Sequence, residues 1–224
     1  MRKFKHEKID LGYLDRDLVV ESTKMGRLYS TPDGSFPSVT TVLSILTEDA
    51  IAAWRARVGE EEANKISHKA SSRGTKVHSI IEDYLNGKDT SEYLPNIRQS
   101  LVNVQPILDS RIVRIFGIEV PLYSKYLGLA GRCDAVAEFD GVVSILDWKT
   151  SRYPKKKEKI SNYFCQMAAY AIMFEERTGM PVTNLAVVMD VDGHEPLVFK
   201  EHRDNWTDML IDTIKEYNRR KIFS

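Results

Sequence analysis

Two aspartates give this sequence its clearest chemical pattern. Asp134 and Asp147 lie on either side of Asp140-Gly141, a pair that is flanked by alternating apolar residues and therefore predicts a hairpin with a two-residue turn. If Asp140 and Gly141 form that turn, Asp134 lies directly opposite Asp147 on the neighbouring strand. Carboxylates in that position repel each other, so the pairing favours a divalent cation or a shared proton between them.

Lys149 adds a cation to the same face. Side chains alternate along a strand, so Lys149 points to the side of Asp147, whereas Leu146 and Trp148 point towards a core. Such a face suits metal-assisted phosphodiester hydrolysis, in which carboxylates hold Mg²⁺ or Mn²⁺ and the ammonium orients the attacking water. The alternative is a surface hairpin whose three charges are simply solvated.

A third acid joins this row if a second turn is short. The pattern at 112–124 predicts a strand that contains Glu119. A four-residue loop at 125–128 would place Glu119 opposite Asp134, although the register of such loops varies more than that of an Asp-Gly turn.

The composition restricts the class of protein. The 224 residues carry 32 basic and 32 acidic side chains, so a site for a polyanion must come from local clustering of charge. Two cysteines, Cys133 and Cys165, indicate a reducing compartment and no disulfide framework. No apolar run reaches the ~18 residues of a membrane span. The basic start at residues 1–5 lacks an apolar stretch, so we expect no secretion or organelle signal and a cytoplasmic protein in a bacterium or a phage-infected cell.

The remaining patterns predict an α/β (α+β) protein with the helices and strands in a definite order. From residue 75 onward we expect a helix to 86, a helix at 97–107, three antiparallel strands, a helix at 161–177, strands at 183–191 and 195–201, and a final helix. Before it we expect two short strands, helices at 48–58 and 60–70, and a break at 71–75. This divides the chain into an N-terminal hairpin and helical cap, residues 1–74, and a core, residues 75–224.

Three motifs in this order resemble those of a known family. Gly131-x-x-Asp134, Asp147-Trp148-Lys149-Thr150 and Gln166-x-x-x-Tyr170 resemble the motif set of the PD-(D/E)XK nuclease superfamily in its RecB-like branch. Cys133 replaces the usual proline before the first acid, and this branch generally has Gly-x-x-Asp there. The resemblance implies a restriction-endonuclease-like αβββαβ core. Some relatives carry an iron–sulfur cluster, but two cysteines cannot supply its four ligands.

A fourth segment bears on the metal. Taken alone, His78 at the edge of an apolar helical stripe is a structural residue, but Arg73-Gly74-Thr75-x-x-His78-x-x-x-Glu82 resembles the RecB-branch motif whose histidine binds metal. By this resemblance His78, Asp134, Asp147 and the backbone carbonyl of Trp148 hold one or two Mg²⁺ or Mn²⁺ ions, and Glu119 either binds the second metal or aids the attacking water. Lys149 would orient water, and Gln166 and Tyr170 would position the substrate or the catalytic groups.

Nucleic-acid contacts are expected at two places. Ser38 is a predicted N-cap in a hydroxyl-rich helix start that could seat a phosphate, although most such serines only cap. A basic run leaves the strand that carries Lys149, where phosphate contact competes with an ordinary solvated loop. The expected contacts are Ser38, Arg73, Thr150, Ser151, Arg152, Lys155 and Lys156.

From about residue 35 the chain is similar to the mitochondrial genome maintenance exonuclease group, by Pro37 to Leu43, the motifs above and the final helix. This implies a metal-dependent exonuclease of DNA replication, repair or recombination. It would prefer single-stranded DNA with free ends, threaded under the N-terminal helices, and could work with a replication or recombination protein. Two alternatives remain open: a flap or branch endonuclease of the same fold, and a non-catalytic DNA-binding accessory protein.

Overall fold

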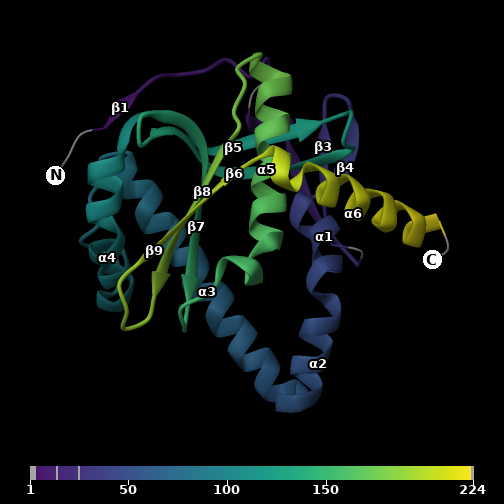
Figure 1. Cartoon of the computed structure of the whole chain (residues 1–224), viewed down its shortest axis with the longest axis horizontal. Coiled ribbons are helices and arrows are strands. Elements are labelled where there is room, and N and C mark those ends of the chain that lie inside the picture. Colours follow the sequence, from purple (N-terminus) through teal and green to yellow (C-terminus); the bar gives the residue numbers. More distant parts are fainter. Residues whose placement is uncertain (1–3, 14, 25, 223–224) are drawn as a thin grey trace.

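A computed structural model describes residues 4–13, 15–24 and 26–222 of the chain, which form an α/β structure around a mixed sheet (Figure 1). The sheet has the strand order β1-β5-β6-β7-β8-β9. Its strands are β1 (Lys5–His6), β5 (Ile112–Ser124), β6 (Leu129–Phe139), β7 (Val142–Ser151), β8 (Asn184–Val191) and β9 (Leu197–His202). Strands β5, β6 and β7 are antiparallel neighbours, and β8 runs parallel to β7.

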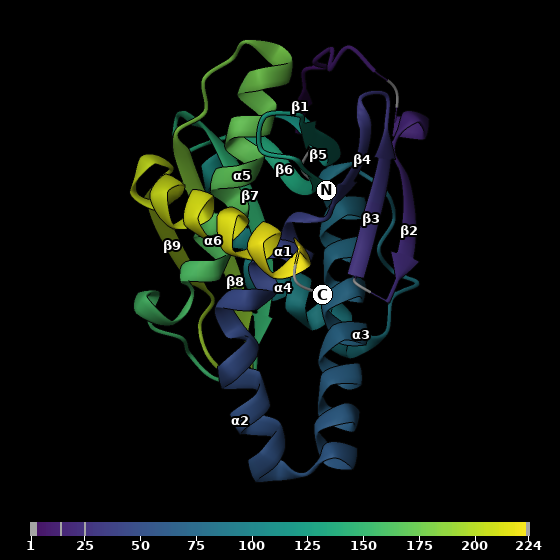
Figure 2. The ribbon, with the colours of Figure 1, turned by 90° about the vertical axis from the view of Figure 1, so that its right-hand side faces the viewer.

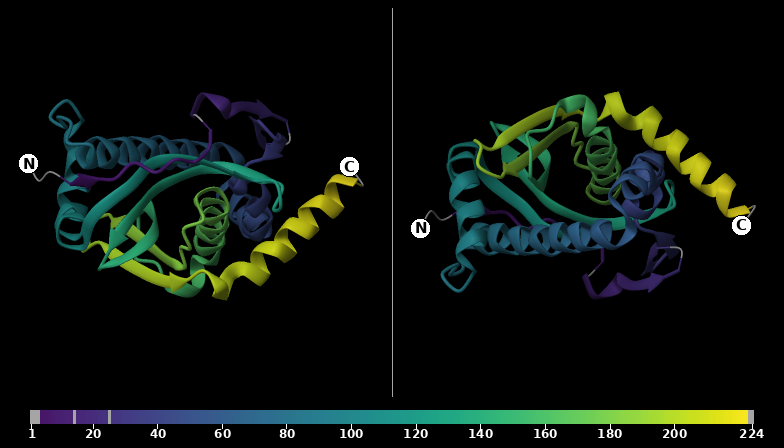
Figure 3. Two further views of the ribbon diagram at one scale, coloured as in Figure 1. Left: turned by 90° about the horizontal axis from the view of Figure 1, so that it is seen from above. Right: turned by 90° about the horizontal axis from the view of Figure 1, so that it is seen from below.

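Helices cover both faces of this sheet (Figure 3). The helices α3 (Glu60–Leu85) and α4 (Pro95–Arg111) share one buried apolar cluster with it. A second cluster holds α5 (Ser161–Thr178), α6 (Asp204–Ile222) and the short α1 (Val39–Leu43) against the sheet. The order α3, β5, β6, β7, α5, β8 confirms the expected αβββαβ core, with α4 placed between α3 and β5.

The N-terminal part adds a small sheet and a helical hairpin. Strands β2 (Val19–Thr23), β3 (Gly26–Thr31) and β4 (Gly34–Pro37) form a three-stranded antiparallel sheet. A 3₁₀ turn at 44–47 leads from α1 into α2 (Glu48–Val58). Helix α2 and the first half of α3 then project from the sheet as a hairpin (Figure 2). The described residues contain no helix long and apolar enough to cross a membrane.

The expected break at 71–75 is wrong, because α3 runs through it without interruption. The boundary drawn between residues 74 and 75 therefore lies inside one helix. The division into a cap and a core remains a proposal about organisation.

The two predicted turns set the register of the central strands. Asp140 and Gly141 both have positive φ, 51° and 80°, as a type I′ turn requires. The pairing runs from Phe139–Val142 to Ala135–Leu146, so its next step brings Asp134 opposite Asp147. On the other side of β6, the pairs Val120–Cys133 and Ile118–Ala135 leave Glu119 opposite Asp134. The three acids therefore lie in one row across three strands, as predicted.

Candidate active site

Three side chains from three elements meet at this row. His78 of α3, Glu119 of β5 and Asp134 of β6 each offer a ligand atom, and these atoms all lie within 4.8 Å of one another. His78 Nδ1 is 3.3 Å from Asp134 Oδ2, which also accepts the backbone N–H of Trp148 at 2.8 Å. The Trp148 N–H thus orients Asp134, and the role of the Trp148 carbonyl as a metal ligand stays a prediction.

Glu119 has an unusual backbone conformation. Its φ of 50° lies in the left-handed region, which residues other than glycine seldom adopt. Its carbonyl accepts a hydrogen bond of 2.8 Å from Arg132 Nη1, and Arg132 Nη2 donates to Asp15. Strain of this kind persists where surrounding contacts hold it, often at functional sites. The outlier therefore supports a role for the Glu119 carboxylate in the site.

Asp147 and Lys149 form a buried ion pair at the end of β7. Lys149 Nζ donates to Asp147 Oδ1 at 2.6 Å, and Asp147 is only 2% exposed. The second oxygen, Oδ2, lies 2.5 Å from the same ammonium but accepts no hydrogen bond from the described residues. Leu146 and Trp148 pack into the core under α3 and α4, as the alternation predicts. A buried carboxylate oxygen that accepts no hydrogen bond is in a suitable state to bind a metal cation.

Burial and mutual repulsion shape the charge of these groups. Burial, with repulsion from Asp134, raises the pKa of Glu119 to about 7. Burial likewise raises the pKa of Asp147 to about 6. Although burial opposes it, the neighbouring His78 and Lys149 lower the pKa of Asp134, and Asp134 in turn raises the pKa of His78. Without a metal, ionising all of the carboxylates of the site at once is therefore unfavourable.

These residues fit a divalent cation. Carboxylate oxygens are the preferred ligands of Mg²⁺ and Mn²⁺, and an imidazole shifts the preference somewhat towards Mn²⁺. His78, Glu119 and Asp134 supply such donors at one point. Asp147 Oδ2, which accepts no hydrogen bond from the described residues, adds another carboxylate oxygen on the neighbouring strand, opposite Asp134.

A cavity of about 590 Å³ opens onto this cluster. Of the residues expected from sequence, it is lined by Ser38, His78, Glu119, Asp134, Lys149, Gln166 and Tyr170. The lining also includes residues for which sequence reasoning assigned no role, namely Val20, Arg27, Tyr29, Thr40, Ser79 and Arg132. Val20, Arg27 and Tyr29 lie in the N-terminal sheet, where no local pattern signals a site, whereas Thr40 belongs to the hydroxyl-rich helix start.

Gly131 and Tyr170 are packed tightly within the cavity wall. A Cβ atom added to Gly131 would lie 2.8 Å from the Tyr170 hydroxyl, closer than real Cβ contacts. The glycine of the Gly-x-x-Asp motif therefore lets the strand approach this ring. Tyr170 is 4% exposed, and burial raises the pKa of its phenol well above the usual value, so the phenol stays neutral.

Arg73 is directed elsewhere. Its guanidinium donates to Asp190 at 2.8 Å and to Asp192 at 2.5 Å, and it does not line the cavity. The Arg73 guanidinium, which we expected to contact a phosphate, is thus paired with two carboxylates. In this structure Arg73 therefore joins α3 to Asp190 and Asp192 at the end of β8, and its contact with a phosphate stays a prediction.

Apart from Ser38, the other expected phosphate contacts lie outside the cavity lining, at the end of β7 and on the loop that follows it. Ser151 donates to the Tyr153 carbonyl at 2.7 Å, and the Arg152 guanidinium lies over the Tyr153 ring. The remaining expected contacts are Thr150, Lys155 and Lys156.

Tyr163 connects this loop with the site. Lys149 Nζ and Lys155 Nζ lie 4.9 and 5.6 Å from the centre of its ring. The basic loop therefore begins beside the lysine of the site. Sequence reasoning gave Tyr163 no role.

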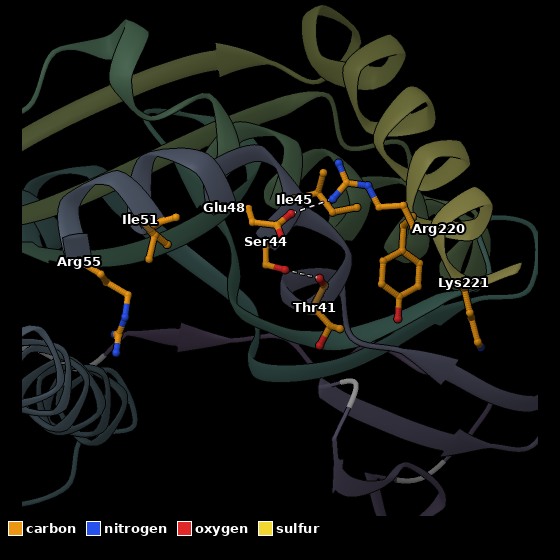
Figure 4. Close-up of a pocket in the computed structure, with 10 residues that line it drawn as sticks. Thr41, Ser44, Ile45, Glu48, Ile51, Arg55, Arg220 and Lys221 are labelled. Carbon is orange, nitrogen blue, oxygen red and sulfur yellow. Dashed lines mark hydrogen bonds and ion pairs between the residues drawn. The ribbon is translucent and has the colours of Figure 1, made fainter. Parts of the chain in front are cut away.

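A second cavity, of about 600 Å³, lies between α2 and α6 (Figure 4). Arg220 crosses its rim to pair with Glu48 at 2.7 Å, while Ile51 and Ile45 supply apolar surface. None of the clustered acids or His78 lines it. The two cavities have about the same volume, so the clustered side chains, and not the volume, locate the chemistry.

Comparison with known proteins identifies the group to which this arrangement belongs. The model of the PD-(D/E)XK nuclease superfamily matches residues 49–219. Mitochondrial genome maintenance exonuclease 1 of Homo sapiens is 29% identical over 53% of this chain and 38% of its own length. The Xenopus tropicalis protein of the same name is 29% identical over 62% of this chain and 43% of its own length. The chain thus spans less than half the length of either relative.

Two solved structures are also similar. One is a putative exonuclease from Eubacterium rectale, with 16% identity over 67% of this chain and 65% of that one, and a TM-score of 0.45. The other is SSO0001, with 14% identity over 81% and 74% of the two chains and a TM-score of 0.45.

Proposed function

The chain belongs to the PD-(D/E)XK nuclease superfamily, and on that premise we propose that it is a metal-dependent deoxyribonuclease. The observation that carries the proposal is the meeting of His78, Glu119 and Asp134 within 4.8 Å. The cavity that they line also contains Lys149. A metal-binding triad and a cation in one cavity are the groups that phosphodiester hydrolysis needs.

The metal would be held by the clustered ligands together with Asp147. Asp134 sits between the others, since it contacts His78 and lies opposite both Glu119 and Asp147 in the strand registers. When bound, Mg²⁺ or Mn²⁺ polarises the scissile phosphate and lowers the pKa of a water molecule. The strained backbone of Glu119 and the Trp148 N–H on Asp134 hold these carboxylates in place beforehand.

Lys149 would act on the attacking water and on the charge that develops in the transition state. Although burial opposes it, Asp147 and Asp134 raise the pKa of Lys149, so the ammonium stays protonated. Its bond to Asp147 fixes the ammonium beside the metal ligands. Tyr170 and Gln166, one turn apart on α5, line the same cavity and offer neutral donors that position the substrate.

We further propose an exonuclease that prefers single-stranded DNA with free ends, in DNA replication, repair or recombination. Two observations support this. The relatives that match are exonucleases by name. The α2–α3 hairpin projects beside the core and could limit entry to a flexible strand (Figure 2).

The test is a time course on end-labelled linear and on circular single-stranded DNA, with Mg²⁺, Mn²⁺ or chelator. We expect metal-dependent loss of linear DNA, with circles spared and Lys149→Ala inactive. Cleavage of circles would favour the flap or branch endonuclease instead. No cleavage with either metal, with DNA still bound, would overturn the enzyme and leave a DNA-binding protein.

A further inference from the structure

We propose that Arg27, with the hydroxyls of Ser38 and Thr40, binds a second phosphate of the nucleic-acid strand, next to the one that is cleaved. The three residues line the same cavity as His78 and Lys149 but come from the N-terminal sheet and from α1. This subsite rests on the proposed nuclease function and adds to it a contact that binds without taking part in the chemistry.

Arg27 is held in place from both sides of its backbone. Its N–H donates to Thr41 Oγ1 at 3.1 Å, and its carbonyl accepts the Ser38 N–H at 2.9 Å. Its guanidinium Nη2 donates to Thr40 Oγ1 at 2.7 Å. Ser38 Oγ lies 3.0 Å from Thr40 Oγ1, so the guanidinium and two hydroxyls form one connected group.

The glycine before Arg27 makes this approach feasible. A Cβ atom on Gly26 would lie 2.5 Å from Thr41 Cγ2, and its φ of 107° is in the range that favours glycine. Strand β3 therefore lies against Thr41 only because residue 26 has no side chain. The close approach is what brings the Arg27 guanidinium to Thr40.

Arg27 differs from Arg132 and Lys149, the other arginine and the lysine that line the cavity, because those two form ion pairs. Arg132 is paired with Asp15 and Lys149 with Asp147. Within the described parts of the chain, Arg27 forms no ion pair, and its guanidinium has one hydrogen bond, to Thr40. A guanidinium has five N–H donors in a planar fork that matches a phosphate. Four donors of an unpaired cation therefore remain for an anion in the cavity.

The subsite is joined to the catalytic strands. Ser38 forms a parallel bridge with Ala130 of β6, and the next residue, Gly131, lines the cavity. Asp134 follows on the same strand. The bridge therefore ties the Arg27 group to the strand that carries Asp134.

The first experiment compares Arg27→Gln, Arg27→Lys and the wild type on a labelled single-stranded oligodeoxynucleotide. We expect Arg27→Gln to raise Kd in chelator and KM in Mg²⁺ by roughly tenfold, since one charge-assisted contact is lost. The value of kcat should stay within about twofold, and Arg27→Lys should recover part of the affinity. The slope of log K against log salt should fall by about 0.7, the value for one phosphate of a single strand.

Arg16→Gln is the matched control. Arg16 lies in the same N-terminal segment, is exposed and does not line the cavity, so its affinity should equal that of the wild type. Equal losses of DNA affinity in Arg16→Gln and Arg27→Gln would show that each arginine contributes only its general positive charge, and would overturn the subsite. Thermal unfolding of each variant establishes that the fold is intact.

The second experiment places a neutral methylphosphonate at successive linkages of the oligodeoxynucleotide. In the wild type, one linkage beside the cleaved one should cost roughly tenfold in affinity, and Arg27→Gln should be insensitive there. The same sensitivity in both proteins would overturn the assignment. A wild type that cleaves no nucleic acid would instead overturn the nuclease function, so the two failures are distinguishable.

Discussion

The guanidinium of Arg73 and the carboxylate of Asp190 form a buried ion pair, with Nη2 2.8 Å from Oδ2. Asp190 is 1% exposed, and its other oxygen accepts the Asn103 amide at 2.9 Å. Because these residues lie on α3, β8 and α4, the pair fixes α3 against the sheet. His78 lies five residues further along α3, so the same contact positions the imidazole.

Arg73→Ala should destabilise the protein by about 3 kcal/mol, because removal of the arginine leaves the buried Asp190 carboxylate without its ion-pair partner. Urea unfolding measures this loss. The matched control is Arg98→Ala, an exposed arginine of α4 without an ion pair among the described residues, which should change stability by less than about 0.5 kcal/mol. Equal effects of the two substitutions would contradict an anchoring role for Arg73.

Local patterns predicted the centre of the site. The turn chemistry of Asp140-Gly141 and the period of two along the strands were enough to place Glu119, Asp134 and Asp147 in one row. Those features depend only on nearby residues. Patterns of this kind therefore fix register before any tertiary contact is known.

Long-range contacts account for what the sequence did not show. The small and hydroxylated residues at 71–75 suggested a break, but the pairing of Arg73 with Asp190, 117 residues away, stabilises a continuous α3. Similarly, Arg27 reaches the cavity only because β3 packs on Thr41. No periodicity signals either contact.

Lys149→Ala should lower kcat by a hundredfold or more, since the ammonium is the cation closest to the metal ligands and acts on charge that develops in the transition state. Affinity for single-stranded DNA should change by less than about threefold, the effect of one lost cation in a cavity with other contacts. Single-turnover cleavage and a binding titration in chelator separate the two quantities. Lys155→Ala serves as the loop control. The Lys155 ammonium lies 5.6 Å from the centre of the Tyr163 ring and does not line the cavity, so this variant should keep its kcat.

Metal affinity should rise with pH through the range from about 6 to about 7. The pKa values of Asp147, about 6, and Glu119, about 7, are raised, so protons compete with the metal below those values. Although burial opposes it, Asp134 also raises the pKa of His78, whose proton competes in the same direction. From pH 8 to pH 5.5 we expect a loss of roughly a hundredfold in Mn²⁺ affinity, measured by calorimetry.

Glu119→Gln provides the control for this titration. It removes a ligand whose pKa is about 7, so Mn²⁺ affinity should be weaker at pH 8. One proton fewer then competes with the metal, so the affinity should fall less steeply from pH 8 to pH 5.5. An unchanged pH profile in this variant would argue that Glu119 is not a ligand.

Two glycines of the cavity wall should respond in opposite ways to alanine. In Gly131→Ala the new Cβ would lie 2.8 Å from the Tyr170 ring and hydroxyl, and the ring is too buried to move freely. Overpacking of this kind costs about 1–3 kcal/mol and displaces a side chain that lines the cavity, so turnover should fall as well. Gly74→Ala meets nothing within 4 Å and lies inside α3, so the higher helix propensity of alanine should stabilise the protein by up to about 1 kcal/mol. Urea midpoints that shift in the same direction for both variants would contradict the tight contact between Gly131 and Tyr170.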